Sequence, residues 1–278
     1  MSSSVGYGTY GLSKRRIDGL FVYAVIYLAF VYVPVLFLPL FSFNDSIYIA
    51  FPLKGFTFEW YGKMVNSPGL IAALTNSIQV ASIVAVLATI FGTLAAKAVT
   101  RYRIPGRGPI VGFIMIPLVI PGIIMGIALL IMSKMVGLPL SLYTIGLGHM
   151  LVSVPFSMLV MISRLEGFDK AMEEASLDLG ENAWCTFWRV TFPLAVPGLI
   201  ASLLLTFTIS FDEFILAFFL AGTDVTLPVY IWSQLRFPTK LPSVLALGAC
   251  ILMASFVLVS FAEWFRRRGV PVKTSSGV

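Results

Sequence analysis

Apolar residues gather in six long runs along the chain, and polar or charged segments separate the runs. The runs cover residues 20–41, 74–96, 110–132, 142–163, 194–220 and 244–262. A helix needs about 20 apolar residues to cross a bilayer core, and a run of this length satisfies its backbone hydrogen bonds in lipid as a helix. The pattern therefore predicts an all-α integral membrane protein with six transmembrane helices.

The same pattern predicts three parts of the chain: an N-terminal tail (1–19), a transmembrane domain (20–262) and a C-terminal tail (263–278). Three basic residues precede the first run, as they do in a secretory signal peptide. The apolar part of a signal peptide is only about 7–15 residues long, however, and this run is longer. We therefore expect an uncleaved first helix, with both tails on one side of the membrane.

Lysine and arginine are distributed unevenly between the two faces. Fourteen of the 19 lie in the tails and in the loops that follow the second and fourth runs. Positively charged segments tend to stay on the cytoplasmic side. We therefore expect both tails and these two loops in the cytoplasm, and we interpret the net charge of +6 as a mark of topology and not of nucleic-acid binding.

Composition narrows the class of protein further. The chain is 58% hydrophobic and 12% charged, whereas soluble domains carry about 25% charged residues. An ordinary soluble enzyme, a disordered protein and a nucleic-acid-binding domain are therefore excluded. Cys185 and Cys250 have no partners at metal-ligand spacing, and the single histidine, His149, is interpreted as a core residue. We expect neither a metal site nor a catalytic triad.

Two features of the apolar pattern leave alternatives open. Pro117 and Pro121 predict a bend in the third run, and Gly122 and Gly126 have the spacing that lets helices approach closely. A translocation pathway or tight packing would explain them equally well.

Between the first two runs, an aromatic cluster could bind an organic cation or lie at the membrane interface. Its members are Phe56, Phe58, Trp60 and Tyr61.

The polar segment 164–193 is too long to be a simple connection between helices. Asp169 is predicted to cap a short helix whose first turns carry Glu173 and Glu174, because the helix dipole favours negative charge there. Gly180 is expected to adopt the left-handed backbone that ends this helix. The segment is therefore predicted to begin with a short acidic helix.

A second short helix is predicted over about residues 183–190, capped by Asn182. Pro193 lacks an amide donor and suits the first turn of the fifth span. Such a helical hairpin could bind a soluble partner or could be purely structural. The chain contains no phosphate-binding Gly-x-x-x-x-Gly-Lys-Ser/Thr motif, so any nucleotide would have to be bound by another chain.

The hairpin resembles the loop signature of permease subunits in ATP-binding-cassette (ABC) importers, Glu-Ala-Ala-x3-Gly-x9-Ile-x-Leu-Pro. The matching residues are Glu174, Ala175, Ser176, Gly180, Val190, Phe192 and Pro193. Four are identical to the signature and three are conservative departures. The likeness extends over most of the chain to the spermidine/putrescine subgroup, second-permease type. It is carried by Glu-Ala-Ser-Leu-Asp-Leu-Gly from Glu174, Ser-Phe-Asp-Glu-Phe from Ser210 and Thr-Leu-Pro-Val-Tyr from Thr226.

This resemblance implies the fold of a type I ABC importer permease and a non-catalytic subunit in a bacterial inner membrane. The first hairpin helix, with Glu174 and Asp178, would fit a groove on an ATPase. The implied partners are a second homologous permease, two ABC ATPase chains, an extracytoplasmic solute-binding protein and membrane lipid, but no nucleic acid. ATP and magnesium would be bound by the ATPase chains, so no cofactor is expected in this chain.

The fifth run contains two carboxylates, Asp212 and Glu213. A carboxylate facing lipid is costly, so such groups normally face a cavity or a partner. Adjacent positions on a helix point about 100° apart, so the two side chains cannot share one role. Either could attract a cationic substrate in the pathway, or both could form pairs between spans.

Other functions predict different features. A permease of the same type could carry an opine, an amino-acid derivative or a phosphonate. An ATP-independent transporter or channel often shows internal repeats, and a membrane enzyme needs a catalytic constellation; neither is found in the sequence. Copurification with an ATPase would distinguish an ABC importer from an ATP-independent transporter and from a membrane enzyme.

Overall fold

The computed structural model describes residues 19–268. The predicted N-terminal tail lies outside the described residues except for Gly19, whereas residues 263–268 of the predicted C-terminal tail belong to the last helix. The helices, in chain order, are α1 (Gly19–Ser42), α2 (Glu59–Val65), α3 (Pro68–Arg101), α4 (Arg107–Val119), α5 (Gly122–Met135), α6 (Leu142–Glu166), α7 (Ala171–Asp178), α8 (Ala183–Thr186), the π-helical turn η1 (Phe187–Thr191), α9 (Phe192–Asp212), α10 (Ile215–Leu220), α11 (Leu227–Gln234), the 3-10 turn η2 (Pro238–Lys240) and α12 (Leu241–Arg268). Of the described residues, 19–62 and 241–268 form one compact unit and 63–240 form another.

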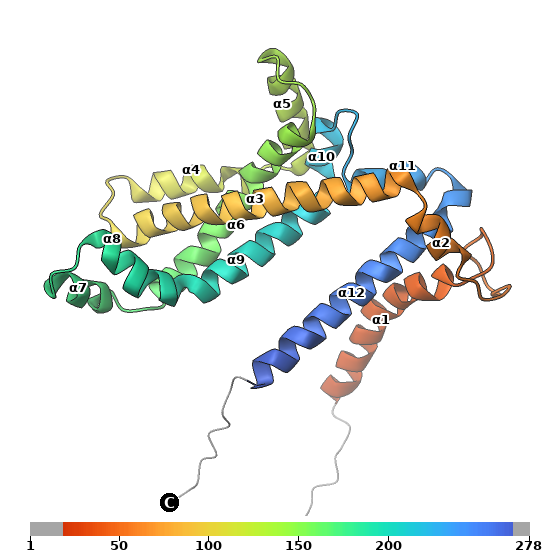
Figure 1. Cartoon of the computed structure of the whole chain (residues 1–278), viewed down its shortest axis with the longest axis horizontal. Coiled ribbons are helices and arrows are strands. Elements are labelled where there is room, and N and C mark those ends of the chain that lie inside the picture. The colour runs from red at the N-terminus through yellow and green to blue at the C-terminus, as the bar shows by residue number, and fades with distance from the viewer. Residues whose placement is uncertain (1–18, 269–278) are drawn as a thin grey trace, which may run out of the picture. The chain divides into compact units, whose positions relative to one another are not determined.

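In the first unit, α1 packs against α12 (Figure 1). The segment after α1 folds around Trp60, whose indole Nε1 donates a hydrogen bond of 2.9 Å to the carbonyl of Asn44. Trp60 is therefore part of the interior of this loop, whereas Phe56 and Phe58 remain 77% and 75% exposed. The predicted aromatic cluster thus does not share one environment, and Trp60 is a packed residue of the loop.

In the second unit, α3, α6 and α9 lie side by side and form its core (Figure 1). Small polar residues line their contacts: the hydroxyl of Ser202 donates to that of Ser157 over 2.7 Å. At Gly92 on α3, an added Cβ would overlap the Ser157 side chain. Small residues and interhelical hydrogen bonds of this kind hold membrane helices together.

Five helical segments among the described residues are long and apolar enough to cross a membrane. They are Gly19–Ser42, Pro68–Arg101, Leu142–Glu166, Ala183–Asp212 and Pro238–Val257. These segments correspond to the first, second, fourth, fifth and sixth predicted runs. The third run is different. It consists of α4 and α5, which pass the same test only as a pair and are bent by 100°.

The bend in the third run follows from its prolines and glycines. Pro121 precedes α5 and interrupts the hydrogen-bond ladder between the two helices. Helix α5 then leaves the layer of α3, α6 and α9 and runs beside α10 (Figure 1). A Cβ at Gly122 would lie 3.3 Å from Ile215, and one at Gly126 would overlap the ring of Phe219. The glycine pair therefore serves close packing between α5 and α10.

The helix of the fifth run begins earlier than predicted. It begins at Ala183, because α8, η1 and α9 follow one another without a break. The second hairpin helix is therefore the start of the fifth span and not a separate element. Pro193 cannot donate to the carbonyl four residues earlier, and the amide of Phe192 bonds instead to the carbonyl of Phe187, five residues earlier. This π-helical turn lets the helix continue.

Candidate functional site

Helix α7 begins almost as predicted. Lys170 occupies the cap position, but the Asp169 carboxylate accepts the amide hydrogen of Ala171 over 3.0 Å. Glu173 and Glu174 lie in the first turn, where the positive end of the helix dipole stabilises them. The predicted acidic start of the hairpin is confirmed, with its cap shifted by one residue.

The end of α7 also follows the prediction. Gly180 has φ of +89°, a left-handed conformation that glycine adopts without strain. The chain then turns, and the side chain of Asn182 accepts the Cys185 amide hydrogen over 2.8 Å at the start of α8. Two local signals in the sequence therefore identified the turn of the hairpin.

The signature residues, together with Asp178 of the same predicted coupling loop, fall into two groups in space. Four are exposed on α7 and its turn: Glu174, Ala175, Asp178 and Gly180. The other four lie where α7 meets the continuous helix of α8, η1 and α9. Ser176 is on the α7 side of this contact, and Val190, Phe192 and Pro193 belong to η1 and the start of α9. The Ser176 and Thr186 hydroxyls share a hydrogen bond of 3.0 Å, and the Phe192 and Trp188 ring centroids lie 4.8 Å apart. The structure thus brings both halves of the signature together in one hairpin.

Three residues at this hairpin were missed by the sequence analysis as a group. Arg101 Nε lies 3.2 Å from Glu173 Oε2, and these side chains are 6% and 16% exposed. The Thr191 hydroxyl donates to the other oxygen, Glu173 Oε1, over 2.7 Å. A signal existed, because Lys97 and Arg101 lie one helical turn apart at the end of an apolar run. Nothing in the sequence, however, identified the carboxylate that Arg101 would meet.

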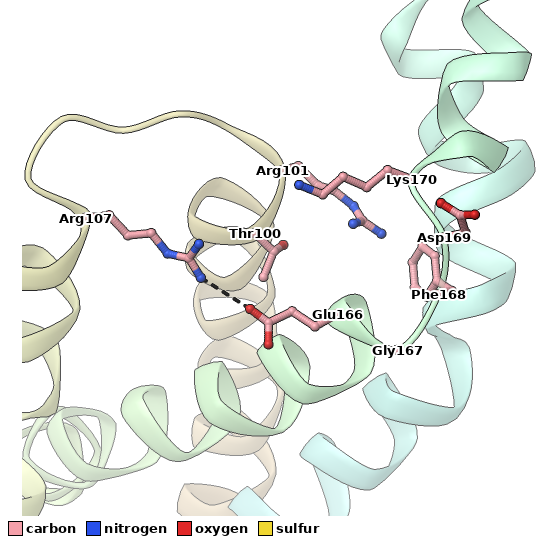
Figure 2. Close-up of a pocket in the computed structure, with 8 residues that line it drawn as sticks. All are labelled: Thr100, Arg101, Arg107, Glu166, Gly167, Phe168, Asp169 and Lys170. Atoms are coloured by element: carbon pink, nitrogen blue, oxygen red, sulfur yellow. Dashed lines mark hydrogen bonds and ion pairs between the residues drawn. The ribbon is translucent and has the colours of Figure 1, made fainter.

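Arg101 makes two further contacts. Its Nη2 donates to the carbonyl of Leu165 over 3.0 Å, and its guanidinium lies 4.7 Å from the centroid of the Phe168 ring. Arg101 and Lys170 both line a polar cavity of about 390 Å³ (Figure 2). Arg107 and Glu166, which line the same cavity, form an ion pair of 3.3 Å (Figure 2).

The two carboxylates of the fifth run have different environments. Asp212 is the last residue of α9 and is exposed. Glu213 lies in the break before α10, and its Oε1 accepts the amide hydrogens of Ile215 and Leu216 over 2.9 and 3.1 Å. Glu213 therefore caps α10, while the Asp212 side chain remains accessible. Whether substrate meets either residue remains a prediction.

His149 lies inside the second unit. It is 1% exposed, and its Nδ1 is 2.8 Å from the Ser210 hydroxyl. Its Nε2 has no hydrogen-bond partner among the described residues. The interpretation of His149 as a core residue is confirmed. In the described part of the chain, no three His, Cys, Asp or Glu side chains are grouped to hold a metal ion.

Solved structures confirm the predicted fold. A permease chain in the crystal structure of a bacterial ABC transporter for the polysaccharide alginate matches with a TM-score of 0.67, over 92% of this chain and 99% of that one, at 20% identity. A chain from the same kind of transporter, in complex with an alginate pentasaccharide-bound periplasmic protein, matches with a TM-score of 0.71 over 94% and 96%, at 17% identity. At such identities the likeness concerns the fold alone.

Similar sequences point to transport. The spermidine/putrescine transport system permease protein PotC of Haemophilus influenzae is 34% identical over 88% of this chain and 94% of its own length. PotC of Escherichia coli is 32% identical over 91% and 95%. The putrescine transport system permease protein PotI of Escherichia coli is 32% identical over 85% and 86%.

A family model covers the hairpin, the core helices α6 and α9 and the last part of α3. It is described as the binding-protein-dependent transport system inner membrane component, and it matches residues 88–269. That match includes α6, α7 and α9, and with them the whole signature loop. The chain therefore belongs to the family of inner membrane components of binding-protein-dependent transport systems.

Proposed function

We propose that this chain is a permease subunit of an ABC importer and forms half of a translocation pathway for polyamines such as spermidine and putrescine. The observation that carries the proposal is the similarity to PotC and PotI over nearly the whole chain. The exposed signature helix α7 supports it, because a non-catalytic membrane subunit needs a surface on which an ATPase can act.

The surface of the hairpin has the character of a docking site. Leu179 and Trp184 are 87% and 69% exposed, and Glu174 and Asp178 of the same hairpin are exposed as well. Exposed apolar groups within a polar rim are typical of protein interaction surfaces. The proposed occupant is an ABC ATPase, present in two copies, which binds ATP and magnesium. One copy would meet this chain and the other a second, homologous permease.

The proposed orientation places α7 and both tails in the cytoplasm of a bacterium, because fourteen of the 19 lysine and arginine residues lie on that side. The opposite face would then receive substrate from a solute-binding protein. A complex with a periplasmic protein is described for the similar alginate transporter.

Asp212 is the proposed station for a cationic substrate. It is an exposed carboxylate at the end of an apolar membrane helix, where lipid contact would be costly. Glu213 holds the break after α9 by capping α10. It would act by fixing the position of Asp212 and not by meeting the substrate.

Reconstitution tests this function. The chain is coexpressed with the proposed second permease and the ATPase, and the complex is purified and placed in liposomes with the solute-binding protein. We expect the ATPase to copurify and spermidine uptake to require ATP, with competition by putrescine but not by an opine or a phosphonate. Uptake that proceeds without an ATPase would indicate a secondary transporter instead. ATP-dependent uptake in which an opine or a phosphonate replaces spermidine would contradict only the polyamine assignment.

A further inference from the structure

We propose that Arg101, Glu173 and Thr191 form a coupling clamp that makes α7 move as one body with the adjoining ends of α3, α6 and α9. They would be positioning residues, which transmit ATPase motion to the membrane spans without touching nucleotide or substrate. The inference rests on the proposed function of α7 as the ATPase docking helix.

Helix α7 needs such a device because little else holds it. It has eight residues, all described, and none of them is buried. Isolated helices shorter than about 12 residues are marginal in water, so the position of α7 depends on side-chain contacts with its surroundings. Among its own side chains, Glu173 and Ser176 reach the elements behind it. A force applied to α7 therefore passes inward through contacts of this kind and through the short connections at its two ends.

Arg101 connects three elements with one planar group. From the end of α3, its guanidinium pairs with Glu173 of α7, donates to the Leu165 carbonyl at the end of α6, and covers the ring of Phe168 in the connection to α7. Figure 2 shows Arg101 extending from α3 toward the segment that carries Phe168 and Lys170. Arginine suits this role because its fork of donors is rigid and always charged.

Glu173 extends the connection to the fifth span. One carboxylate oxygen faces Arg101 and the other accepts the Thr191 hydroxyl. Thr191 is 2% exposed and closes η1 directly before α9. A single side chain on α7 is therefore tied to α3 and to the base of α9, and through Arg101 to α6. Those are the three helices that form the core of the second unit.

Burial distinguishes the coupling clamp from the ion pairs around it. Arg101 and Glu173 are largely shielded from water, so salt and solvent weaken their attraction little. The neighbouring pair between Arg107 and Glu166 has a similar distance of 3.3 Å, but its side chains are 50% and 56% exposed. Exposed pairs contribute little, which makes Glu166 a matched control at the same end of the unit.

The test uses the complete transporter in liposomes, with both permeases, both ATPase copies and the solute-binding protein. Glu173→Gln keeps an acceptor for Thr191 but removes the charge opposite Arg101, and Thr191→Val removes the hydroxyl with little change in shape. We expect ATP hydrolysis to persist while spermidine imported per ATP falls about two- to thirtyfold, the range for residues within a coupling network. Glu166→Gln should keep the wild-type ratio.

A double variant tests whether Arg101 and Glu173 act as one pair. Arg101→Gln combined with Glu173→Gln should lower the import ratio no further than the more severe single variant, because either change already breaks the pair. Additive losses would mean that the two residues act separately, and would overturn the coupling clamp.

The remaining outcomes are also decisive. A wild-type import ratio in Glu173→Gln contradicts the coupling clamp, and so does a parallel fall of hydrolysis and import, which would assign Glu173 to ATPase docking. Failure of both Glu173→Gln and Thr191→Val to assemble would make the group a folding element and overturn the proposal as well. The wild-type transporter tests the proposed function separately. If it imports spermidine without consuming ATP, both the proposed importer function and the coupling clamp are refuted.

Discussion

At the level of single residues, neighbours in the sequence occupy different environments at the end of α9. Asp212 ends the helix and is exposed, whereas one carboxylate oxygen of Glu213 accepts hydrogen bonds from the first amides of α10. An ionised side chain on a membrane helix is retained where it meets water, a partner or a substrate. Glu213 has a structural partner, so Asp212 is the residue on which the substrate hypothesis depends.

Asp212→Asn should lower spermidine uptake about tenfold, which corresponds to the loss of about 1.4 kcal/mol of attraction for the substrate. The amide has nearly the same shape, so assembly and basal ATP hydrolysis should not change. Uptake is measured in liposomes that contain the complete complex. Asp224→Asn, at an exposed residue of the connection before α11, is the control and should have no effect. Equal uptake by both variants would remove Asp212 from the pathway.

Gly180→Val should uncouple transport while leaving the complex assembled. The φ of +89° at Gly180 costs an L-residue about 1–2 kcal/mol, and a β-branched side chain is a particular outlier there. The turn between α7 and α8 would shift, and with it the docking surface. Spermidine uptake and ATPase binding are the measurements. Gly108→Ala, at a helical position with open space around it, should behave as wild type; normal uptake by Gly180→Val would contradict the assignment.

The ends of α7 were predictable because Asp169, Gly180 and Asn182 act on amides or turns within a few residues of themselves. The pairing of Arg101 with Glu173 was not, since the two residues are far apart in the chain and only the packing of α7 brings them together. The role of Glu213 was hidden for a related reason. Its capping bonds exist only because the fifth run breaks there.

At the level of elements, small residues decide how the three core helices approach one another. The Ser157 hydroxyl occupies the space beside Gly92, where a Cβ would overlap it, and Ser202 from α9 bonds to the same hydroxyl. The contact between α3 and α6 is therefore set by the missing side chain at residue 92. Any larger residue must push the two helices apart.

Gly92→Ala should destabilise the protein by about 1–3 kcal/mol, the usual cost of overfilling a packed interior. Thermal unfolding of the purified protein in detergent is the measurement. Gly112→Ala is the matched control, because that glycine also lies within a helix, α4, but has nothing within 4 Å of an added Cβ. Equal melting temperatures for the two variants would show that α3 and α6 can separate without cost.

The apolar runs identified the membrane helices but not their continuity. Pro117 and Pro121 indicated a bend, yet its 100° depends on how α5 packs against α10. The break after Asp212 had no proline or glycine to mark it. Conversely, Pro193 suggested the start of a helix, whereas the π-helical turn carries the helix through it. Tertiary packing set the angle of the bend, whereas a local change in hydrogen bonding carries the helix through Pro193.

At the level of the whole molecule, composition was enough to identify a membrane protein, and the signature loop was enough to identify its family. The direction of the chain across the bilayer rests on charge alone. The uneven distribution of lysine and arginine predicts that the loop after α3 and the hairpin share one side, while the segment before α2 and the one before α11 share the other.

Cysteine labelling tests this topology in intact cells. Single cysteines replace Phe58, Arg103, Asp178 or Asp224, all exposed, in a background without Cys185 and Cys250. An impermeant maleimide should react at positions 58 and 224 only, and disruption of the membrane should make 103 and 178 reactive. Phe58 is preferred to the nearby Trp60, which is buried. Labelling at 178 in intact cells would reverse the orientation.

The π-helical turn η1 sets the angular alignment between α8 and α9. Its hydrogen bonds close over five residues and so take up one residue more than an α-helical turn would, and each helical residue corresponds to about 100° of rotation. The side of α8 that carries Trp184 therefore cannot be found by counting back from α9 on a helical wheel. A relative lacking one residue here could keep both helices and still present its hairpin about 100° around the axis of the fifth span. Insertions and deletions in this short turn would thus alter which partner surface fits the hairpin without altering any residue that touches the partner.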